Sequence, residues 1–384
     1  MQKVFDRIDA AFPQYVKIWE DICNIESPTA EKARVDEVGN YFVRFAEARG
    51  WAVERFEQPL VGDVVCITMN EGAAGKPITL SGHMDTVHPV GLFGSPAVKI
   101  EGDRIYGPGV MDCKGGLVVA LLAMAALEDA GFSERPLRLL LQSDEEGGSA
   151  VSNKATIGYI CEKSADSAAF LNLEGHSVGK LCVRRKGIIT FTFKIHGIEA
   201  HSSACAKRGA NAIAEAAHKI LKMEKLKDPD GLTCNCGVIK GGSVPNTVAG
   251  YCEFKANIRF VTDEQLAWVT EYAKQVAETV HIPGCTCELE ESSFRVAMKR
   301  RDINLALLDR INVAMEKAGF STFEPELSAG GSDAADVTAY GKVPCVDKLG
   351  VTGRSIHSPN EFAHLESLRE MAKRVAAIVW FFEE

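Results

Sequence analysis

Short apolar segments, each followed within three residues by an acidic or histidine side chain, constrain the fold of this chain most. Three such segments occupy residues 77–81, 137–141 and 168–173, and a long apolar helix is predicted between the first two, over about residues 115–130. Each segment has the length and composition of a strand that is buried on both faces of a parallel sheet. The alternation of strands and helices predicts an α/β fold, with a doubly wound, mostly parallel sheet and helices on both of its faces.

The pattern of the sequence changes after about Lys186. From there to residue 292, predicted elements follow the order β-α-β-β-α-β, which is typical of an α+β ferredoxin-like sandwich. We therefore predict that residues 1–186 and 293–384 form one α/β domain and that residues 187–292 are a domain inserted into it. The chain is predicted to end in a helix over residues 361–382.

Charge and composition exclude several classes of partner. A net charge of −9 argues against a nucleic-acid surface, which normally needs an excess of basic residues. The longest apolar run, residues 117–127, is shorter than the roughly 18 residues of a membrane span, and the first residues carry no signal-peptide core. Without an export signal, the twelve cysteines are expected to be reduced thiols of a cytoplasmic protein.

Acidic and histidine side chains are concentrated where the predicted strands end. They are His83, Asp85, Asp144, Glu145, Glu146 and Glu174, together with Asp112 in a glycine-rich loop before the long helix. The carboxyl ends of neighbouring strands meet at one edge of such a sheet, where ligands bind. So many carboxylates at one place need cations to neutralise them, and oxygen and imidazole ligands suit zinc, cobalt or manganese.

Each of these residues also has a purely structural interpretation. An acid after a strand is often only a turn former or a helix N-cap, but it is improbable that every buried strand of one region ends in an acid for that reason. The Cys234/Cys236 and Cys285/Cys287 pairs of the inserted domain are predicted to be reduced strand thiols, because structural zinc sites use the wider spacing C-x₂₋₄-C.

Five short motifs are distributed along most of the chain. They are Ser81-Gly82-His83-Met84-Asp85-Thr86-Val87, Tyr106-Gly107-Pro108-Gly109-Val110-Met111-Asp112, Asp144-Glu145-Glu146-Gly147, Leu173-Glu174-Gly175 and Ile356-His357-Ser358. With these motifs the chain resembles the dinuclear zinc amidohydrolases and peptidases that include glutamate carboxypeptidase, aminoacylase, acetylornithine deacetylase and succinyl-diaminopimelate desuccinylase. The resemblance implies an enzyme that hydrolyses a peptide or N-acyl amide bond next to a free carboxylate, with a water that bridges two Zn²⁺ per chain, Co²⁺ and Mn²⁺ being possible.

The resemblance also implies a role for each motif residue. The metal ligands would be His83, Asp112, Glu146, Glu174 and His357. Asp112 would bridge the two ions, with His83 and Glu174 completing one site and the other two ligands the second. Glu145 would be the general base, and Asp85 the partner that orients His83. Cys113 stands where the family commonly has Met, Asn or Asp, and the peptide bond before it is often cis in the family.

The inserted domain resembles the lid of the family, through which two chains form a homodimer. His201 would stabilise the oxyanion in the neighbouring subunit's site. Asn246 and Arg259 would hold the substrate carboxylate, which an Arg fork suits geometrically, and Gly331 would line the pocket.

The substrate is less constrained than the chemistry. Residues 86–109 resemble the glutamate carboxypeptidase branch, and Lys180 is placed to meet a side-chain carboxylate, which favours a C-terminal glutamate or aspartate. An aminoacylase, another N-acyl-amino-acid deacylase or a dipeptidase is the alternative within the family. Outside it, a non-catalytic acyl-amino-acid-binding relative would have lost a ligand or the base, and a thiol redox protein would need a C-x-x-C motif, which is absent.

Overall fold

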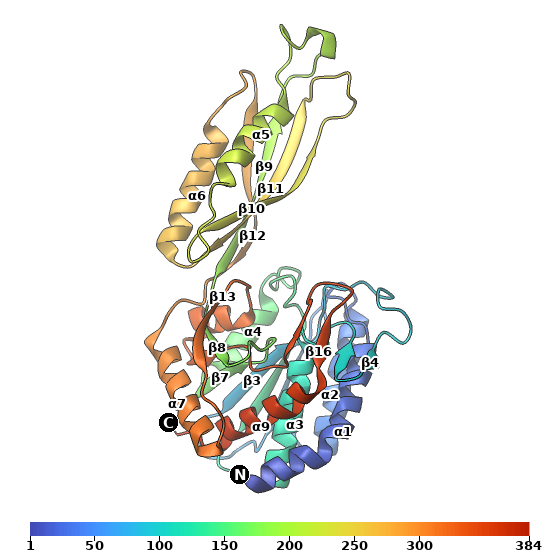
Figure 1. Ribbon diagram of the computed structural model, residues 1–384, viewed down its shortest axis with the longest axis vertical. Helices are drawn as coiled ribbons and strands as arrows, with labels where there is room; N and C mark the ends of the chain where they lie inside the picture. Colours follow the sequence, from blue (N-terminus) through green and yellow to red (C-terminus); the bar gives the residue numbers. More distant parts are fainter. Residues whose placement is uncertain (384) are drawn as a thin grey trace. The chain divides into compact units, whose positions relative to one another are not determined.

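The computed structural model describes residues 1–383, and the chain packs into two compact units (Figure 1). Unit 1 comprises Met1–Arg184, Arg300–Leu327 and the residues from Ser332 onward, whereas unit 2 comprises Arg185–Lys299 and Ser328–Gly331. Each unit has its own apolar core. Unit 1 is therefore assembled from segments that lie far apart in the sequence.

The centre of unit 1 is a six-stranded sheet with the order β1-β2-β6-β3-β7-β14. The strands are β1 (Ala52–Phe56), β2 (Val64–Met69), β3 (Ile78–His83), β6 (Leu137–Gln142), β7 (Ala169–Asn172) and β14 (Cys345–Val346). The last four run parallel, while β1 and β2 form an antiparallel edge. The three apolar strands predicted from the sequence are β3, β6 and β7, and the predicted α/β class is confirmed.

Helices cover both faces of this sheet (Figure 1). They are α1 (Gln2–Asn24), α2 (Lys32–Ala48), α3 (Lys114–Asp129), α4 (Ala155–Ser164), α7 (Asp302–Ala318), the short α8 (Asp333–Asp336) and α9 (Leu365–Trp380). Helix α3 is the predicted long helix, and its first fourteen residues are all buried because α1 and α9 pack against it. A helix that is apolar on every side is expected in such a position.

Small accessory sheets complete unit 1. A four-stranded sheet has the order β15-β16-β5-β4, and β8 pairs with β13. The strands are β4 (Lys99–Glu101), β5 (Arg104–Tyr106), β8 (Lys180–Arg185), β13 (Glu324–Ser328), β15 (Gly353–Arg354) and β16 (Phe362–His364). The predicted start of the last helix was wrong, because residues 362–364 pair with β5 as a strand and α9 begins only at Leu365.

Unit 2 is a four-stranded antiparallel sheet covered by two helices. Its elements are β9 (Gly187–His196), α5 (Ala212–Met223), β10 (Thr233–Gly241), β11 (Tyr251–Phe260), α6 (Asp263–Glu278) and β12 (Thr286–Arg295). The sheet order β10-β11-β9-β12 with this chain order is the ferredoxin-like arrangement. Thr262 and Gln265 form a capping box that starts α6. The catalytic and lid roles of the two predicted domains remain predictions.

A buried ion pair within α5 lies against the end of α6. Lys219 and Glu215 are each 1% exposed, and their charged atoms lie 3.0 Å apart. Lys219 Nζ also donates to the carbonyls of Val276, Ala277 and Thr279 at the end of α6. Burial acts to raise the pKa of Glu215, but Lys219 and two backbone N–H groups lower it to about 2.

Replacing Lys219 by Met is therefore expected to lower the free energy of unfolding of unit 2 by about 3–5 kcal/mol, because it leaves the Glu215 carboxylate buried without its cation. Urea unfolding followed by circular dichroism measures this change. Lys274→Met, at an exposed position of α6, is the matched control and should change stability by no more than about 0.5 kcal/mol. Equal stability of the two variants would contradict the structural role of the pair.

Membrane-spanning helices and disulfide bonds are the two other features on which the sequence supports an expectation. Among residues 1–383, no helix combines the length and the apolar character that a membrane span requires. The twelve cysteines form no disulfide within the same residues.

Candidate metal centre

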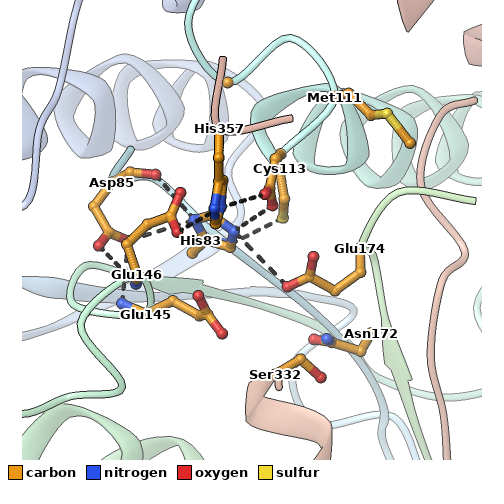
Figure 2. A network of polar contacts seen from close by, with 12 residues as sticks. His83, Asp85, Met111, Cys113, Glu145, Glu146, Asn172, Glu174, Ser332 and His357 are labelled. Carbon is orange, nitrogen blue, oxygen red and sulfur yellow. Dashed lines mark hydrogen bonds and ion pairs between the residues drawn. The ribbon is translucent and has the colours of Figure 1, made fainter. Parts of the chain in front are cut away.

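Histidine and carboxylate side chains from five segments of unit 1 meet at one edge of the parallel sheet (Figure 2). His83 is the last residue of β3, Glu146 follows β6 and Glu174 follows β7. Asp112 precedes α3, and His357 lies between β15 and β16. The three adjacent strands run parallel, so their carboxyl ends bring these residues together as the sequence predicts.

The Asp112 carboxylate is shared between two imidazoles. Its Oδ1 lies 3.1 Å from Nε2 of His83, and its Oδ2 lies 3.2 Å from Nε2 of His357. Each imidazole also meets one further carboxylate: Glu174 Oε1 lies 3.8 Å from His83 Nε2, and Glu146 Oε2 lies 3.2 Å from His357 Nε2. The cluster therefore divides into two sets of one imidazole and two carboxylates, with Asp112 common to both.

The electrostatics of this cluster are those of a site that needs cations. Burial raises the pKa of Glu146 to about 7, with the Asp112 carboxylate adding to the effect. Burial also acts to raise the pKa of Asp112, but the imidazoles of His357 and His83 bring it below its usual range. The pKa of His357 rises to about 10 because it contacts two carboxylates. These oxygen and nitrogen donors fit divalent cations, which would neutralise the crowded carboxylates.

His357 occupies an unusual backbone conformation. Its φ of +59° lies in the left-handed region, which costs a residue with a Cβ about 1–3 kcal/mol and persists only where the surroundings enforce it. Such residues cluster at functional sites, which agrees with a ligand role for His357.

Asp85 organises the ends of two strands. Its carboxylate is fully buried, with Oδ1 3.4 Å from Nδ1 of His83, whose Nδ1 also lies 2.9 Å from the Asp85 carbonyl oxygen. The same carboxylate accepts the backbone N–H groups of Glu145 and Glu146 at 3.2 and 3.1 Å and the hydroxyl of Thr29 at 2.8 Å. Asp85 therefore orients both the His83 ring and the Glu145-Glu146 turn.

Glu145 is buried beside the ligands without being part of either set. It is 7% exposed, and its carboxylate extends toward the side of the cluster where Glu174 and Asn172 lie (Figure 2). Because its backbone is held by Asp85, its side chain starts from a defined position. This placement suits a group that exchanges a proton with a reactant next to the metal ligands.

Cys113, which departs from the residues common in the family at this position, lies directly beside the cluster. Its sulfur is fully buried, accepts the backbone N–H of His83 at 3.2 Å and belongs with His83 and Glu174 to one group of side chains that could hold a metal ion. Burial raises the pKa of the Cys113 thiol to about 12. The Asp112-Cys113 peptide bond is cis.

The remaining predicted site residues, except Lys180, belong to unit 2. His201 is exposed, and its segment pairs with that of Asn246, whose carbonyl accepts the N–H of Ser202 at 2.9 Å. On β11, Arg259 donates through Nη1 to the carbonyl of Ala329 at 3.3 Å, so it lies against the loop that contains Gly331.

Lys180 is the first residue of β8 in unit 1 and is exposed to solvent. Its exposure leaves the ammonium group accessible to a solute.

Sequence reasoning missed two residues that support the cluster. Glu361 and His88 are buried and in contact with each other, although 273 positions separate them in the sequence. His88 lies three residues after Asp85 but matches no ligand position of the motifs, and no local pattern marks Glu361.

The family comparison matches residues 79–380 to the model described as peptidase family M20/M25/M40. Carboxypeptidase G2 from Pseudomonas sp. (strain RS-16) is 28% identical over 90% of this chain and 83% of its own length. Acetylornithine deacetylase from Myxococcus xanthus is 27% identical over 84% of this chain and 86% of its own.

Solved structures share the fold over nearly the whole chain. A tripeptidase from Staphylococcus aureus superposes with a TM-score of 0.80 at 24% identity, covering 96% of this chain and 97% of that one. A metallo-carboxypeptidase from Sulfolobus solfataricus superposes with a TM-score of 0.76 at 18% identity, covering 95% and 98%. At these identities the likeness concerns the fold.

Proposed function

Since the chain belongs to peptidase family M20/M25/M40, a family of metal-dependent peptidases and amidohydrolases, we propose that it hydrolyses a peptide or N-acyl amide bond next to a free carboxylate with two divalent metal ions, which we take to be zinc. The observation that supports this proposal most directly is the division of the Asp112 carboxylate between His83 and His357. A carboxylate shared in this way is the arrangement that a bridging ligand of two ions requires.

In this proposal each side chain of the cluster has one task. His83, Asp112 and Glu174 would hold one ion, and Asp112, Glu146 and His357 the other. Bound cations of this kind polarise a carbonyl group and make a water molecule more nucleophilic.

The proton transfers fall to Glu145. Its carboxylate would take the proton of the attacking water and return it to the nitrogen of the leaving amine. Asp85 keeps Glu145 in place through the backbone N–H group at 3.2 Å. A substrate carboxylate would meet Arg259, whose planar guanidinium matches the geometry of a carboxylate.

The metal requirement is tested first. Purified protein is expected to bind two divalent ions per chain, measured by elemental analysis after dialysis, and exhaustive chelation should abolish hydrolysis, which Zn²⁺, Co²⁺ or Mn²⁺ should then restore. Full activity after chelation, with no more than one ion tightly held beforehand, would contradict the proposal.

Two substrate classes are favoured by different observations. The resemblance to carboxypeptidase G2 and the exposed Lys180 support a carboxypeptidase of glutamate-carboxypeptidase type, acting on a short peptide or small molecule with a free C-terminal carboxylate. The resemblance to acetylornithine deacetylase supports an N-acyl-amino-acid deacylase. Hydrolysis rates for matched pairs, such as a peptide ending in glutamate and the corresponding N-acetylated amino acid, distinguish the two.

We further propose that two chains pair through unit 2. Strand β10 is an edge strand of the sheet, and its Val238 and Ile239 are 45% and 52% exposed. An exposed apolar edge strand offers unpaired backbone groups to a second copy. Light scattering measures the oligomeric state. A cytoplasmic location stays a prediction from the sequence.

A further inference from the structure

The carboxylate of Glu361 is buried against the loop that carries Asp112. Glu361 is 1% exposed and lies four residues after His357. Its Oε1 accepts the backbone N–H groups of Met111 and Asp112 at 2.9 and 3.1 Å, and its Oε2 accepts that of Gly109 at 3.3 Å. Three backbone donors therefore converge on one carboxylate, and one of them belongs to the residue shared by both sets of ligands.

His88 completes the surroundings of this carboxylate. Its Nε2 donates to Oε2 of Glu361 at 2.8 Å, and it is 4% exposed. The ring of Phe93 packs edge-on against the His88 ring, with 5.0 Å between the centroids. The imidazole is thus held by packing on one side and by the carboxylate on the other.

Three ligand-bearing segments meet at Glu361. Residues 83–88 contribute His83 and His88, residues 107–112 contribute Asp112, and residues 357–361 contribute His357 and Glu361 itself. The backbone supports the same junction, because the N–H of Gly107 donates to the carbonyl of Glu361 at 3.3 Å. A shift of this carboxylate would move ligands of both proposed ions relative to each other.

We infer that Glu361 is a positioning residue for the metal centre and that His88 holds the Glu361 carboxylate in place. This inference rests on the proposed function. Glu361 fixes the backbone of Asp112, so that the two carboxylate oxygens of Asp112 face His83 and His357 at the same time. Hydrogen bonds to a charged acceptor are stronger than those to a neutral one, so the carboxylate serves this purpose better than an amide.

The test measures metal binding and uses no substrate. Glu361→Gln keeps the size of the side chain but puts an NH₂ group where backbone N–H groups need an acceptor. We expect the affinity for at least one Co²⁺ per chain to fall about 10–100-fold, the range found when groups that support metal ligands are lost. Titration of metal-free protein with Co²⁺, followed by visible absorption, reports both affinity and coordination.

His88 provides a second, milder pair of variants. His88→Phe keeps a ring against Phe93 but removes the donor, and it should weaken Co²⁺ binding in the same direction as Glu361→Gln. His88→Gln retains an N–H donor and should restore at least part of the lost affinity. A merely structural role would make both variants equal in Co²⁺ binding, and that result would overturn the assignment of His88.

Asp36→Asn is the matched control for Glu361→Gln. Asp36 also accepts a backbone N–H, that of Asp63 at 2.7 Å, but it lies on α2 and contacts no proposed ligand. The Co²⁺ affinity of the Asp36→Asn variant should equal that of the unmodified protein. The urea midpoints of the metal-free proteins show whether any loss of binding follows from lost folding.

Unchanged Co²⁺ affinity in both Glu361→Gln and His88→Phe would overturn the inference, as would a loss of affinity that matches the loss of stability in every variant, the control included. Failure of the proposed function looks different. In that case the unmodified protein itself would not bind two Co²⁺ per chain.

Discussion

Replacing Glu145 by Gln is expected to lower kcat by at least about 10²-fold, and by up to about 10⁴-fold, while both metal ions stay bound. Glutamine keeps the size of the side chain and can accept a hydrogen bond, but it cannot take a proton from water at neutral pH. The backbone N–H of residue 145, which donates to Asp85 at 3.2 Å, is unaffected by the change. The loss should therefore appear in kcat and leave the metal content at the level of the unmodified protein.

The neighbouring residue gives a matched control for this prediction. Glu146→Gln is the same chemical change one position later, at a side chain that lies 3.2 Å from His357 and that we propose as a ligand. It should weaken metal binding, whereas Glu145→Gln should not. Activity of Glu145→Gln within a few-fold of the unmodified enzyme would show that the general-base role is wrong.

The central part of the fold could be predicted because burial dictates its sequence. Strands β3, β6 and β7 are almost wholly buried, so apolar residues predominate in them, and the charged residues that follow them stand out. Helix α3 is predicted for the same reason. The strand-end pattern by itself therefore points to His83, Glu174 and the acidic run 144–146, whereas the choice of Glu146 as the ligand within that run depends on the family resemblance.

The accessory sheets and the support of the site carry no comparable pattern. Strand β4 is fully exposed and only three residues long, and β16 replaces the start of a predicted helix because it pairs with β5, far away in the sequence. Pairing between distant segments, rather than local propensity, determines both. The contact of His88 with Glu361 is likewise a contact between segments that lie far apart in the sequence.

The predicted site residues of unit 2 also lack a local sequence signal. His201, Asn246 and Arg259 were identified by resemblance alone, since nothing in their local sequence distinguishes them from ordinary surface residues. The structure places the segment of His201 beside that of Asn246 and places Arg259 against the loop of Gly331.

His201→Ala is expected to lower kcat by about 10²–10³-fold, or roughly 3–4 kcal/mol, if His201 stabilises the oxyanion as the resemblance implies. His201 belongs to unit 2 and the proposed metal ligands to unit 1, and we propose that His201 serves the site of the partner subunit. In that case neither chain of the homodimer has a complete site of its own. The position of His201 in an exposed turn, with Nδ1 2.8 Å from the Ser203 hydroxyl, leaves Nε2 as the nitrogen that could donate to the oxyanion.

Mixing two inactive variants tests this arrangement. When His201→Ala and Glu145→Gln chains exchange subunits, each mixed dimer has one site with both Glu145 and a His201 from the partner, and one site that lacks both. Random exchange makes half of the dimers mixed, so about a quarter of the original activity should return. If His201 acted within its own chain, no site in the mixture would contain both groups, and activity would stay at the level of the separate variants. A mixture of Glu146→Gln and Glu145→Gln chains is the control, because both changes affect unit 1 and no pairing of these chains restores a complete site.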